Sequence, residues 1–392
     1  MERALDLVVF GATGFTGRLV AEVLQGARQR EQGLRWALAG RQAGRLAEVR
    51  DAIGAPADLP LLTADAADPA SLAALVGKAR VVISTVGPYQ QHGEPLLRAC
   101  AAAGTDYVDL CGEPLWMADM IPALQGAAAD SGARLVFSCG FDSIPFDLGV
   151  VFLQTEMVER FGAPATEVRG RVRVMKGAMS GGTAASAMGT MARIGREPEL
   201  AATLADSFAL TPGFRGPPQP PLGGAVYDDW AKAWTSPFVM ASINTKNVHR
   251  SNLLRGHPWG TDFVYDERQL CGDGAGGRQR AQRFARQDRV QQFVLRQGLL
   301  RKLVQRYMLP QPGQGPDRAA REAGRYEVAF TGQTAAGQRL TAVVRGAGDP
   351  GYGSTSRMIV EAALTLLREV GRGATPGGVW TPGAAMGLAL AR

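Results

Sequence analysis

The sequence of 392 residues contains only four cysteines and three histidines, so two common sources of reactive side chains are scarce. The cysteines lie far apart, and their spacing matches neither a zinc-binding motif nor a disulfide framework. The histidines are equally scattered and show no metal-ligand spacing. We therefore expect free thiols and no metal site.

Two kinds of hydrophobic segment are missing as well. No uninterrupted apolar run reaches the roughly 18 residues of a membrane-spanning helix. The first residues, Met1–Asp6, lack the basic start and the apolar stretch of a secretory signal. These absences predict a cytoplasmic protein.

Lysine is rare, and this rarity excludes one large class of reductases. The chain has five lysines, and none of them lies four residues after a tyrosine. Short-chain dehydrogenases use a Tyr-x-x-x-Lys pair for proton transfer. Their chemistry is therefore excluded in its usual form.

Basic residues are in excess, with a net charge of +7, but the excess is local. Nine basic residues and one acid lie between Arg278 and Arg306. Apolar residues recur at helical spacing from Val290 to Tyr307, as in a basic amphipathic helix. We expect either peripheral membrane contact through residues 278–308 or a packed helix with a solvated basic face. No nucleic-acid-binding module accompanies the patch, so we expect no nucleic-acid partner.

The first third of the chain alternates short, mostly apolar segments with helical patterns. The first segment, Asp6–Gly11, ends in glycine and is typical of a buried parallel strand. Further strands are expected at Trp36–Ala39, Leu61–Thr63, Arg80–Gly87, Tyr107–Leu110 and Arg134–Cys139. Residues 1–147 are therefore predicted to form an α/β domain with a Rossmann-type, doubly wound parallel sheet.

The pattern changes after Asp147. The segment Val168–Met175 alternates basic and apolar side chains, which is typical of a half-solvated antiparallel strand. More strands are expected at Phe238–Asn244, Tyr326–Thr331 and Leu340–Gly346, and a long helix at Thr355–Val370. Residues 148–347 are therefore predicted to form a second, α+β domain that holds the substrate.

A glycine-rich segment lies where the first strand meets the first helix. Gly11 allows a tight turn, Gly14 lets the backbone approach a pyrophosphate, and Gly17 allows close packing of helix and strand. The pyrophosphate would lie on the unpaired N–H groups of the helix start. We expect the whole segment to bind a dinucleotide: Gly11, Ala12, Thr13, Gly14, Phe15, Thr16 and Gly17.

The end of the second strand indicates which dinucleotide is bound. NAD-specific sites place an acidic residue there for the ribose 2′-hydroxyl. Residues 36–44 contain no acid but do contain Arg41, whose guanidinium can pair with a 2′-phosphate. NADP(H) is therefore the predicted cofactor.

Two further segments should complete the cofactor site. Asp65, after the third strand, is expected either at the adenine edge or as an ordinary helix cap. The loop after the fourth strand should face the nicotinamide ribose. Its residues are Thr85, Val86, Gly87, Pro88 and Tyr89.

These motifs resemble those of the saccharopine dehydrogenase-like oxidoreductases, and in particular the trans-acting enoyl reductase subfamily. The segments that carry the resemblance are Gly11–Gly17, Ala39–Arg41, Val86–Tyr89, Tyr107–Glu113, Cys139–Asp147, Ser180–Thr183 and Gly348–Gly353. The resemblance covers nearly the whole chain. It implies a substrate domain after the Rossmann domain, and a C-terminal segment, 348–392, whose helix returns to the first domain. For some members of this branch it also implies reduction of carbon–carbon double bonds in polyketide-derived lipid precursors.

Enoyl reduction needs a proton donor or a stabilised enolate besides the hydride. Tyr352, between two glycines, is the first candidate for the donor; the alternative is a turn residue packed at the domain hinge. Ser180, Gly181, Gly182 and Thr183 could open a helix whose N–H groups bind the substrate. Close helix packing explains these glycines equally well. Asp142 and Asp147 are expected to brace the domain junction rather than to act in catalysis.

We therefore expect an NADPH-dependent oxidoreductase that reduces a double bond of a lipid or polyketide acyl precursor and forms a homodimer. An apolar substrate fits the aromatic and methionine side chains of the second region: Trp230, Trp234, Phe238, Met240 and Trp259. Two alternatives remain. One is an NADP(H)-binding sensor or interaction protein without turnover, and the other is a saccharopine reductase-like amino-acid dehydrogenase.

Overall fold

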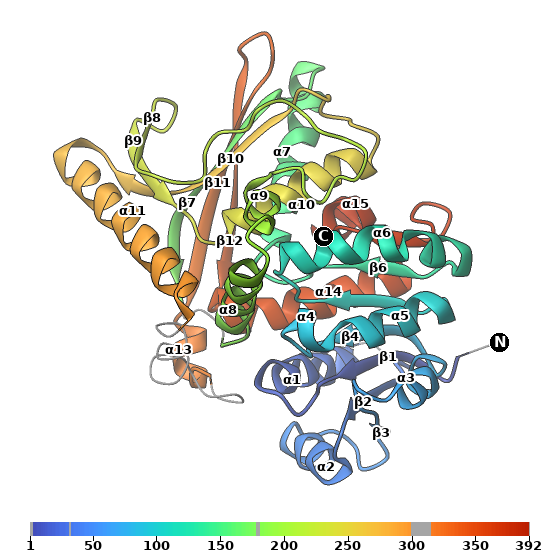
Figure 1. The fold of residues 1–392 in the computed structure, drawn as a ribbon. Helices are drawn as coiled ribbons and strands as arrows, with labels where there is room; N and C mark the ends of the chain where they lie inside the picture. Colours follow the sequence, from blue (N-terminus) through green and yellow to red (C-terminus); the bar gives the residue numbers. More distant parts are fainter. Residues whose placement is uncertain (1–2, 31–32, 178–180, 299–314, 392) are drawn as a thin grey trace.

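The computed structural model describes residues 3–30, 33–177, 181–298 and 315–391. The chain forms two β-sheets with helices packed around them (Figure 1). We call the seven-stranded sheet of the N-terminal part sheet A and the six-stranded sheet of the middle part sheet B. The red C-terminal helix lies against sheet A rather than beside the preceding strands (Figure 1).

Sheet A is parallel, with the strand order β13-β6-β5-β4-β1-β2-β3. Its strands are β1 (Leu5–Phe10), β2 (Trp36–Gly40), β3 (Leu61–Thr63), β4 (Ala79–Ser84), β5 (Asp106–Asp109), β6 (Arg134–Val136) and β13 (Gly378–Trp380). Every residue of β1, β2 and β5 is buried, which explains why β1 and β2 are almost continuously apolar. The predicted Rossmann-type sheet is thereby confirmed.

Helices cover both faces of sheet A. Along β1, Leu7 and Val9 point into one apolar core, and Val8 and Phe10 point into the other. The first core is closed by α1 (Phe15–Arg30), α2 (Ala43–Ala52) and α14 (Thr355–Arg368). The second is closed by α3 (Pro69–Val76), α5 (Glu94–Ala103) and α6 (Pro114–Ser131).

The C-terminal segment returns to sheet A in two ways. Helix α14 packs beside α1 and against β4 and β5. Strand β13 then adds itself to the edge of the sheet as a parallel neighbour of β6. The expected return of the C-terminal helix is confirmed, whereas β13 was not predicted because three residues carry no detectable period.

Sheet B is mixed, with the order β12-β11-β7-β10-β9-β8 and one parallel pair, β7 with β10. Its strands are β7 (Glu167–Lys176), β8 (Val226–Asp228), β9 (Ala233–Pro237), β10 (Val264–Gly272), β11 (Arg325–Gln333) and β12 (Arg339–Ala347). Helix α7 (Ile144–Phe161) packs on β11 and β12, and α10 (Ala241–Leu254) packs on β10. Helix α11 (Gly274–Arg296) lies against β9 and β10, and α8 (Gly181–Arg196) contacts α11. The α+β character of the second region is thereby confirmed.

The expected strand at Phe238–Asn244 is wrong. Strand β9 ends at Pro237, and α10 begins at Ala241. Almost every residue of α10 is buried, including Asn244, Lys246 and Asn247, so the helix shows no polar face. Without that face the sequence has no period of 3.6 from which a helix could be recognised.

The basic segment forms a helix earlier in the sequence than expected. Helix α11 spans Gly274–Arg296, whereas the expected apolar stripe ran from Val290 to Tyr307. Residues 299–308 of that stripe lie outside the described residues. No helix in the described part of the chain is long and apolar enough to cross a membrane.

Candidate functional site

The glycine-rich segment forms a tight loop between β1 and α1. Gly11 has a φ of +88°, in the left-handed region, and a Cβ there would lie 2.7 Å from Val86 Cγ2. A Cβ on Gly17 would overlap the carbonyl group of Gly11. The loop is therefore compact because α1 begins directly against the end of β1, with its first N–H groups at the carboxyl edge of sheet A.

Replacing Gly17 by alanine is expected to destabilise the protein by about 3 kcal/mol or more, because the new methyl group meets backbone that cannot yield. Gly26, in the same helix, is the matched control, since a Cβ there meets no atom within 4 Å. Its replacement by alanine should stabilise α1 by up to about 1 kcal/mol. Urea denaturation measures both changes. Equal midpoints for the two variants would contradict this close approach of α1 to the loop.

The end of β2 presents two arginines next to the glycine loop. Arg41 and Arg45 are both exposed, and within the described residues neither side chain has an ion-pair partner. A Cβ on Gly40 would lie 3.8 Å from Thr13 Cγ2, so the end of β2 and the loop are in contact range. These guanidinium groups fit a 2′-phosphate on a ribose held between the loop and β2.

Asp65 and Thr85 both make local contacts at the carboxyl edge of sheet A. Asp65 Oδ1 accepts a hydrogen bond of 3.0 Å from Ala67 N, within the turn that leads to α3. The N-cap of α3 itself is Asp68. Thr85 Oγ1 donates to the carbonyl oxygen of Phe10 at 3.1 Å, which ties the end of β4 to the glycine loop. The adenine contact of Asp65 stays a prediction.

The loop after β4 is held by a buried carboxylate. The Gly87–Pro88 peptide bond is cis, and the short helix α4 (Tyr89–His92) follows it. Glu113 accepts hydrogen bonds from Tyr89 N at 2.7 Å and from Ser186 Oγ of α8 at 2.7 Å. Glu113 thus joins the loop that carries Val86 and Tyr89 to α8, a helix of the second region.

Asp142 lies at the junction between the two sheets. It follows β6, and its carboxylate is hydrogen bonded to the side chain of Thr183 in α8. A Cβ on Gly112 would lie 3.8 Å from Asp142 Oδ2 and 4.0 Å from Met240 Cε. Burial raises the pKa of Asp142 to about 6, because the charged form is poorly solvated there.

Tyr352 lies on the other side of the same helix end. Its hydroxyl oxygen accepts a hydrogen bond of 2.9 Å from Gly181 N, and its ring meets Phe15 edge-on at 4.8 Å. Asp349 accepts from Tyr352 N and so holds the turn in place. We call Gly112, Asp142, Gly181, Thr183 and Tyr352 the junction cluster.

The structure thus brings together residues that are far apart in the sequence. The glycine loop, the loop after β4 and the junction cluster all lie at or next to the carboxyl ends of β1, β4, β5 and β6. This is the edge at which ligands bind in open α/β sheets. Ser180 lies outside the described residues, so only Gly181, Gly182 and Thr183 of its motif are placed. From the sequence, Asp142 was expected to brace the domain junction. Its position after β6, at the edge where ligands bind, was the signal that could have identified it as a functional residue.

Asp147, from the same motif as Asp142, has a different environment. Its Oδ2 accepts a hydrogen bond from Gly383 N at 2.7 Å, and Ser251 donates a further hydrogen bond to the same carboxylate. Burial raises its pKa to about 6 as well. Asp147 therefore braces the C-terminal segment.

The apolar candidates for a substrate pocket separate into two groups. Met240 lies beside Gly112 in the junction. By contrast, Phe238 packs on Phe146 in the core, and the guanidinium of Arg169 lies 3.9 Å from the ring centroid of Trp230. Met240 is therefore the member of this group that is positioned to contact a substrate at the junction.

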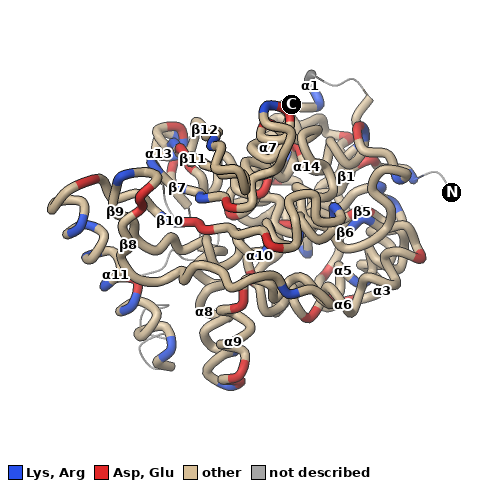
Figure 2. Tube along the Cα trace, turned by 90° about the horizontal axis from the view of Figure 1, so that it is seen from above, with Lys and Arg blue, Asp and Glu red and all other residues tan. Residues whose placement is uncertain are grey.

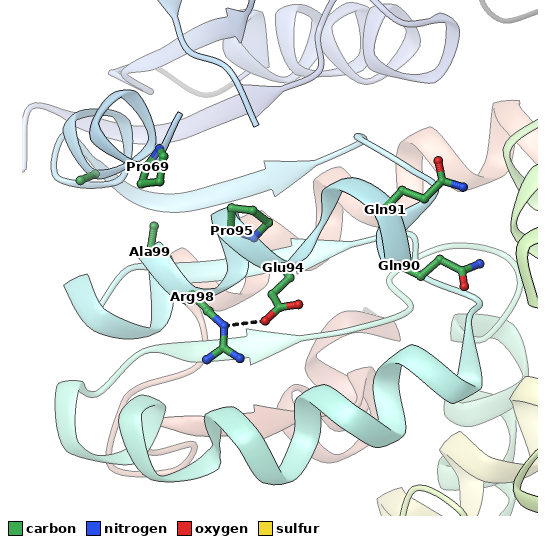
Figure 3. A pocket seen from close by; sticks show the side chains of 8 residues that line it. Pro69, Gln90, Gln91, Glu94, Pro95, Arg98 and Ala99 are labelled. Atoms are coloured by element: carbon green, nitrogen blue, oxygen red, sulfur yellow. Dashed lines mark hydrogen bonds and ion pairs between the residues drawn. The ribbon is translucent and has the colours of Figure 1, made fainter. Parts of the chain in front are cut away.

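A surface cavity of about 620 Å³ lies between α3 and the α4–α5 segment (Figure 3). Figure 3 shows Gln90 and Gln91 at one end of it, and Arg98 paired with Glu94 at 2.7 Å along its side. None of the residues expected to bind cofactor or substrate lines this cavity. It is therefore separate from the site at the carboxyl edge of sheet A.

Known proteins match both the cofactor part and the whole chain. Residues 7–136 match the family model of the saccharopine dehydrogenase NADP binding domain. A trans-acting enoyl reductase of Mycobacterium bovis is 37% identical over 405 residues, covering 99% of this chain and 95% of the relative. A Mycobacterium tuberculosis protein that carries the same name provisionally is 40% identical over 412 residues, covering 99% of this chain and 94% of the relative.

A solved structure matches the fold over nearly the same length. It is the apo saccharopine dehydrogenase (L-Glu forming) of Saccharomyces cerevisiae, with a TM-score of 0.51 at 12% identity. The match covers 98% of this chain and 95% of that chain. At this identity the likeness shows the fold alone.

Proposed function

The chain belongs to the trans-acting enoyl reductase family of saccharopine dehydrogenase-like, NADP-dependent oxidoreductases, and we propose that it reduces the carbon–carbon double bond of a lipid or polyketide acyl precursor. The acyl chain would be presented by a separate protein, in keeping with reduction in trans. The observation that carries this proposal is the placement of Asp142 and Thr183 beside the NADP-binding edge of sheet A.

The residues at that edge fit NADPH. The glycine loop is tight, because a side chain at Gly11 or Gly17 would collide with its surroundings, and the first N–H groups of α1 would bind the pyrophosphate. Arg41 would hold the 2′-phosphate, and Val86 and Gly87 would lie along the nicotinamide ribose. When bound, the cofactor supplies the hydride, and a proton must reach the carbon next to the acyl carbonyl.

Asp142 is the proposed source of that proton. Its raised pKa keeps a fraction of the carboxyl protonated near neutral pH, as a general acid requires. The hydrogen bond to Thr183 fixes the carboxyl group against α8. In the balanced reaction the double bond is lost, and the two carbons gain one hydride and one proton.

The start of α8 is proposed to bind the acyl carbonyl oxygen. The first N–H groups of a helix have no partners within the helix, and the helix dipole favours negative charge there. Gly181 N donates to the hydroxyl oxygen of Tyr352, and Gly182 N is the proposed donor to the acyl oxygen. Its donation would stabilise the enolate that forms before protonation. Met240 would contact the apolar chain.

Replacing Tyr352 by phenylalanine tests the competing assignment of the proton donor. We expect kcat to fall by about tenfold, because the start of α8 loses one hydrogen bond of about 1 kcal/mol and shifts slightly. The dependence of kcat on pH should keep its shape. With Asp142 as the donor, kcat should fall as the pH rises and Asp142 loses its proton. If kcat of the Tyr352 variant no longer fell at high pH, Tyr352 would be the proton donor instead.

The proposed function is tested by titrating the protein with NADPH and then with a panel of 2-enoyl thioesters of increasing chain length. Loss of NADPH absorbance that depends on the thioester, with the saturated thioester as product, is the expected result. Tight NADPH binding without turnover across the panel would contradict it. Membrane contact through residues 278–308 and a homodimer stay predictions.

A further inference from the structure

We propose that the outward side of α11 is the docking surface for an acidic protein that carries the acyl substrate. The surface, which we call the α11 surface, comprises Arg283, Arg286, Arg289, Val290 and Phe293. This inference rests on the proposed function, because it takes the substrate to arrive on a separate protein.

The two sides of α11 differ in what they contact. Gly277, Ala281 and Ala285 are buried, on the side of the helix that lies against β9 and β10. The spacing of Arg283, Arg286, Val290 and Phe293 places them on the opposite side. The helix is therefore anchored by small residues and presents long side chains to solvent.

The arginines of the α11 surface lack acidic partners among the described residues. Helix α11 carries six arginines and a single acid, Asp288, whose side chain accepts from Gln292. By contrast, Arg169 and Arg171 of sheet B are paired with carboxylates. Figure 2 shows the basic positions of α11 at the outer side of the molecule. Unpaired positive charge of this density attracts a negatively charged partner and accelerates its association.

Two apolar side chains lie among these arginines. Val290 is 61% exposed and Phe293 is 60% exposed. An apolar centre with a charged rim is typical of the contact region of a protein–protein interface. A helix that lies in a membrane surface needs a broad apolar side, whereas α11 uses its other side to pack on sheet B. The observations therefore favour a protein over a membrane.

Helix α8 links α11 to the junction cluster. Helix α11 contacts α8, and its C-terminal end lies beside α8 in Figure 1. Helix α8 begins at Gly181 and carries Gly181 and Thr183 of the junction cluster. A protein seated on α11 would therefore lie next to the helix that leads to the proposed reaction site.

The test compares two substrates and two charge-reversed variants. An oct-2-enoyl group is supplied either as its coenzyme A thioester or as the thioester of a bacterial acyl carrier protein rich in acidic residues. The docking variant is R283E/R286E/R289E, and the control, K78E/K232E/R325E, makes the same charge change at exposed positions elsewhere. For the docking variant we expect kcat/KM to fall by about tenfold or more with the carrier-bound substrate and by less than about twofold with coenzyme A. The control should keep both activities.

Binding of the fluorescently labelled carrier protein, followed by anisotropy, gives a readout that needs no turnover. If neither thioester is reduced, the proposed function fails, and weaker carrier binding by the docking variant alone would still support the α11 surface. The proposal for the α11 surface would be overturned if the docking and control variants lost carrier-dependent kcat/KM equally. It would also be overturned if the docking variant kept both the kinetics and the binding of the carrier protein. Flotation with phosphatidylglycerol vesicles that is lost only in the docking variant, with carrier binding unchanged, would assign the surface to a membrane.

Discussion

Replacement of Asp142 by asparagine is expected to lower kcat for enoyl reduction by about 100-fold or more, the usual effect of removing a general acid. Asparagine preserves the size of the side chain and can still bond to Thr183, but it has no acidic proton. NADPH affinity should be unchanged, because the glycine loop is untouched. Steady-state kinetics and a separate NADPH titration measure the two quantities.

The raised pKa of Asp142 also predicts how kcat and stability should change with pH. Burial raises the pKa of Asp142 from 3.8 to about 6, so the carboxyl holds its proton below about pH 6 and loses it above. Activity that depends on this proton should fall about tenfold per pH unit above that value. The asparagine variant should lack this decline. Because the folded protein binds this proton more tightly than the unfolded chain, the contribution of Asp142 to stability falls as the pH rises from 3.8 to about 6.

Asp147 provides the matched control for both effects. It comes from the same segment, and burial raises its pKa to about 6 as well, but its carboxylate accepts hydrogen bonds from Gly383 N and Ser251, neither of which belongs to the junction cluster. Asp147→Asn should alter stability and leave the high-pH decline of kcat in place. If Asp142→Asn retains that decline with nearly full activity, Asp142 is not the proton donor.

Replacement of Arg41 by glutamate is expected to weaken NADPH binding by about 100-fold, because a charge-assisted hydrogen bond to phosphate is lost and a repulsive charge takes its place. NADH has no 2′-phosphate, so its affinity should hardly change. The ratio of the two dissociation constants, measured by calorimetry, is therefore the sensitive quantity.

Lys78→Glu is the control for this charge change, because Lys78 is exposed and directly precedes β4, at the opposite edge of sheet A. It should leave the NADPH-to-NADH ratio unaltered. An unaltered ratio in Arg41→Glu as well would mean that the 2′-phosphate binds elsewhere, with Arg45 the next residue to replace.

The cofactor half of the protein was predictable because its signals are local. Gly11, Gly14 and Gly17 lie within one short segment, and strands β1 and β4 each hold an apolar run that follows a charged residue, Leu7–Phe10 after Asp6 and Val81–Ile83 after Arg80. The burial of these strands on both faces produces that pattern directly. The Rossmann-type parallel fold of sheet A and the NADP(H) assignment both followed from such features.

The junction and sheet B were less predictable because their signals are not local. Asp142 gains its raised pKa from burial, and its hydrogen-bond partner Thr183 is about 40 residues further along the chain, so its environment is set only by the tertiary fold. Helix α10 is buried all round, so its sequence lacks an amphipathic period. The buried side of α11 consists of glycine and alanine, which stand out less in a sequence than the exposed Val290 and Phe293.

Transfer of isotope from the cofactor to the substrate tests the central claim most directly. NADPH deuterated at the reactive carbon of the nicotinamide is mixed with the protein and a 2-enoyl thioester in ordinary water, and the product is examined by mass spectrometry and NMR. The account predicts one deuterium at carbon 3 of a saturated thioester and an ordinary hydrogen at carbon 2. Deuterium that stays in the cofactor, or a double bond that survives with NADPH bound, would contradict it.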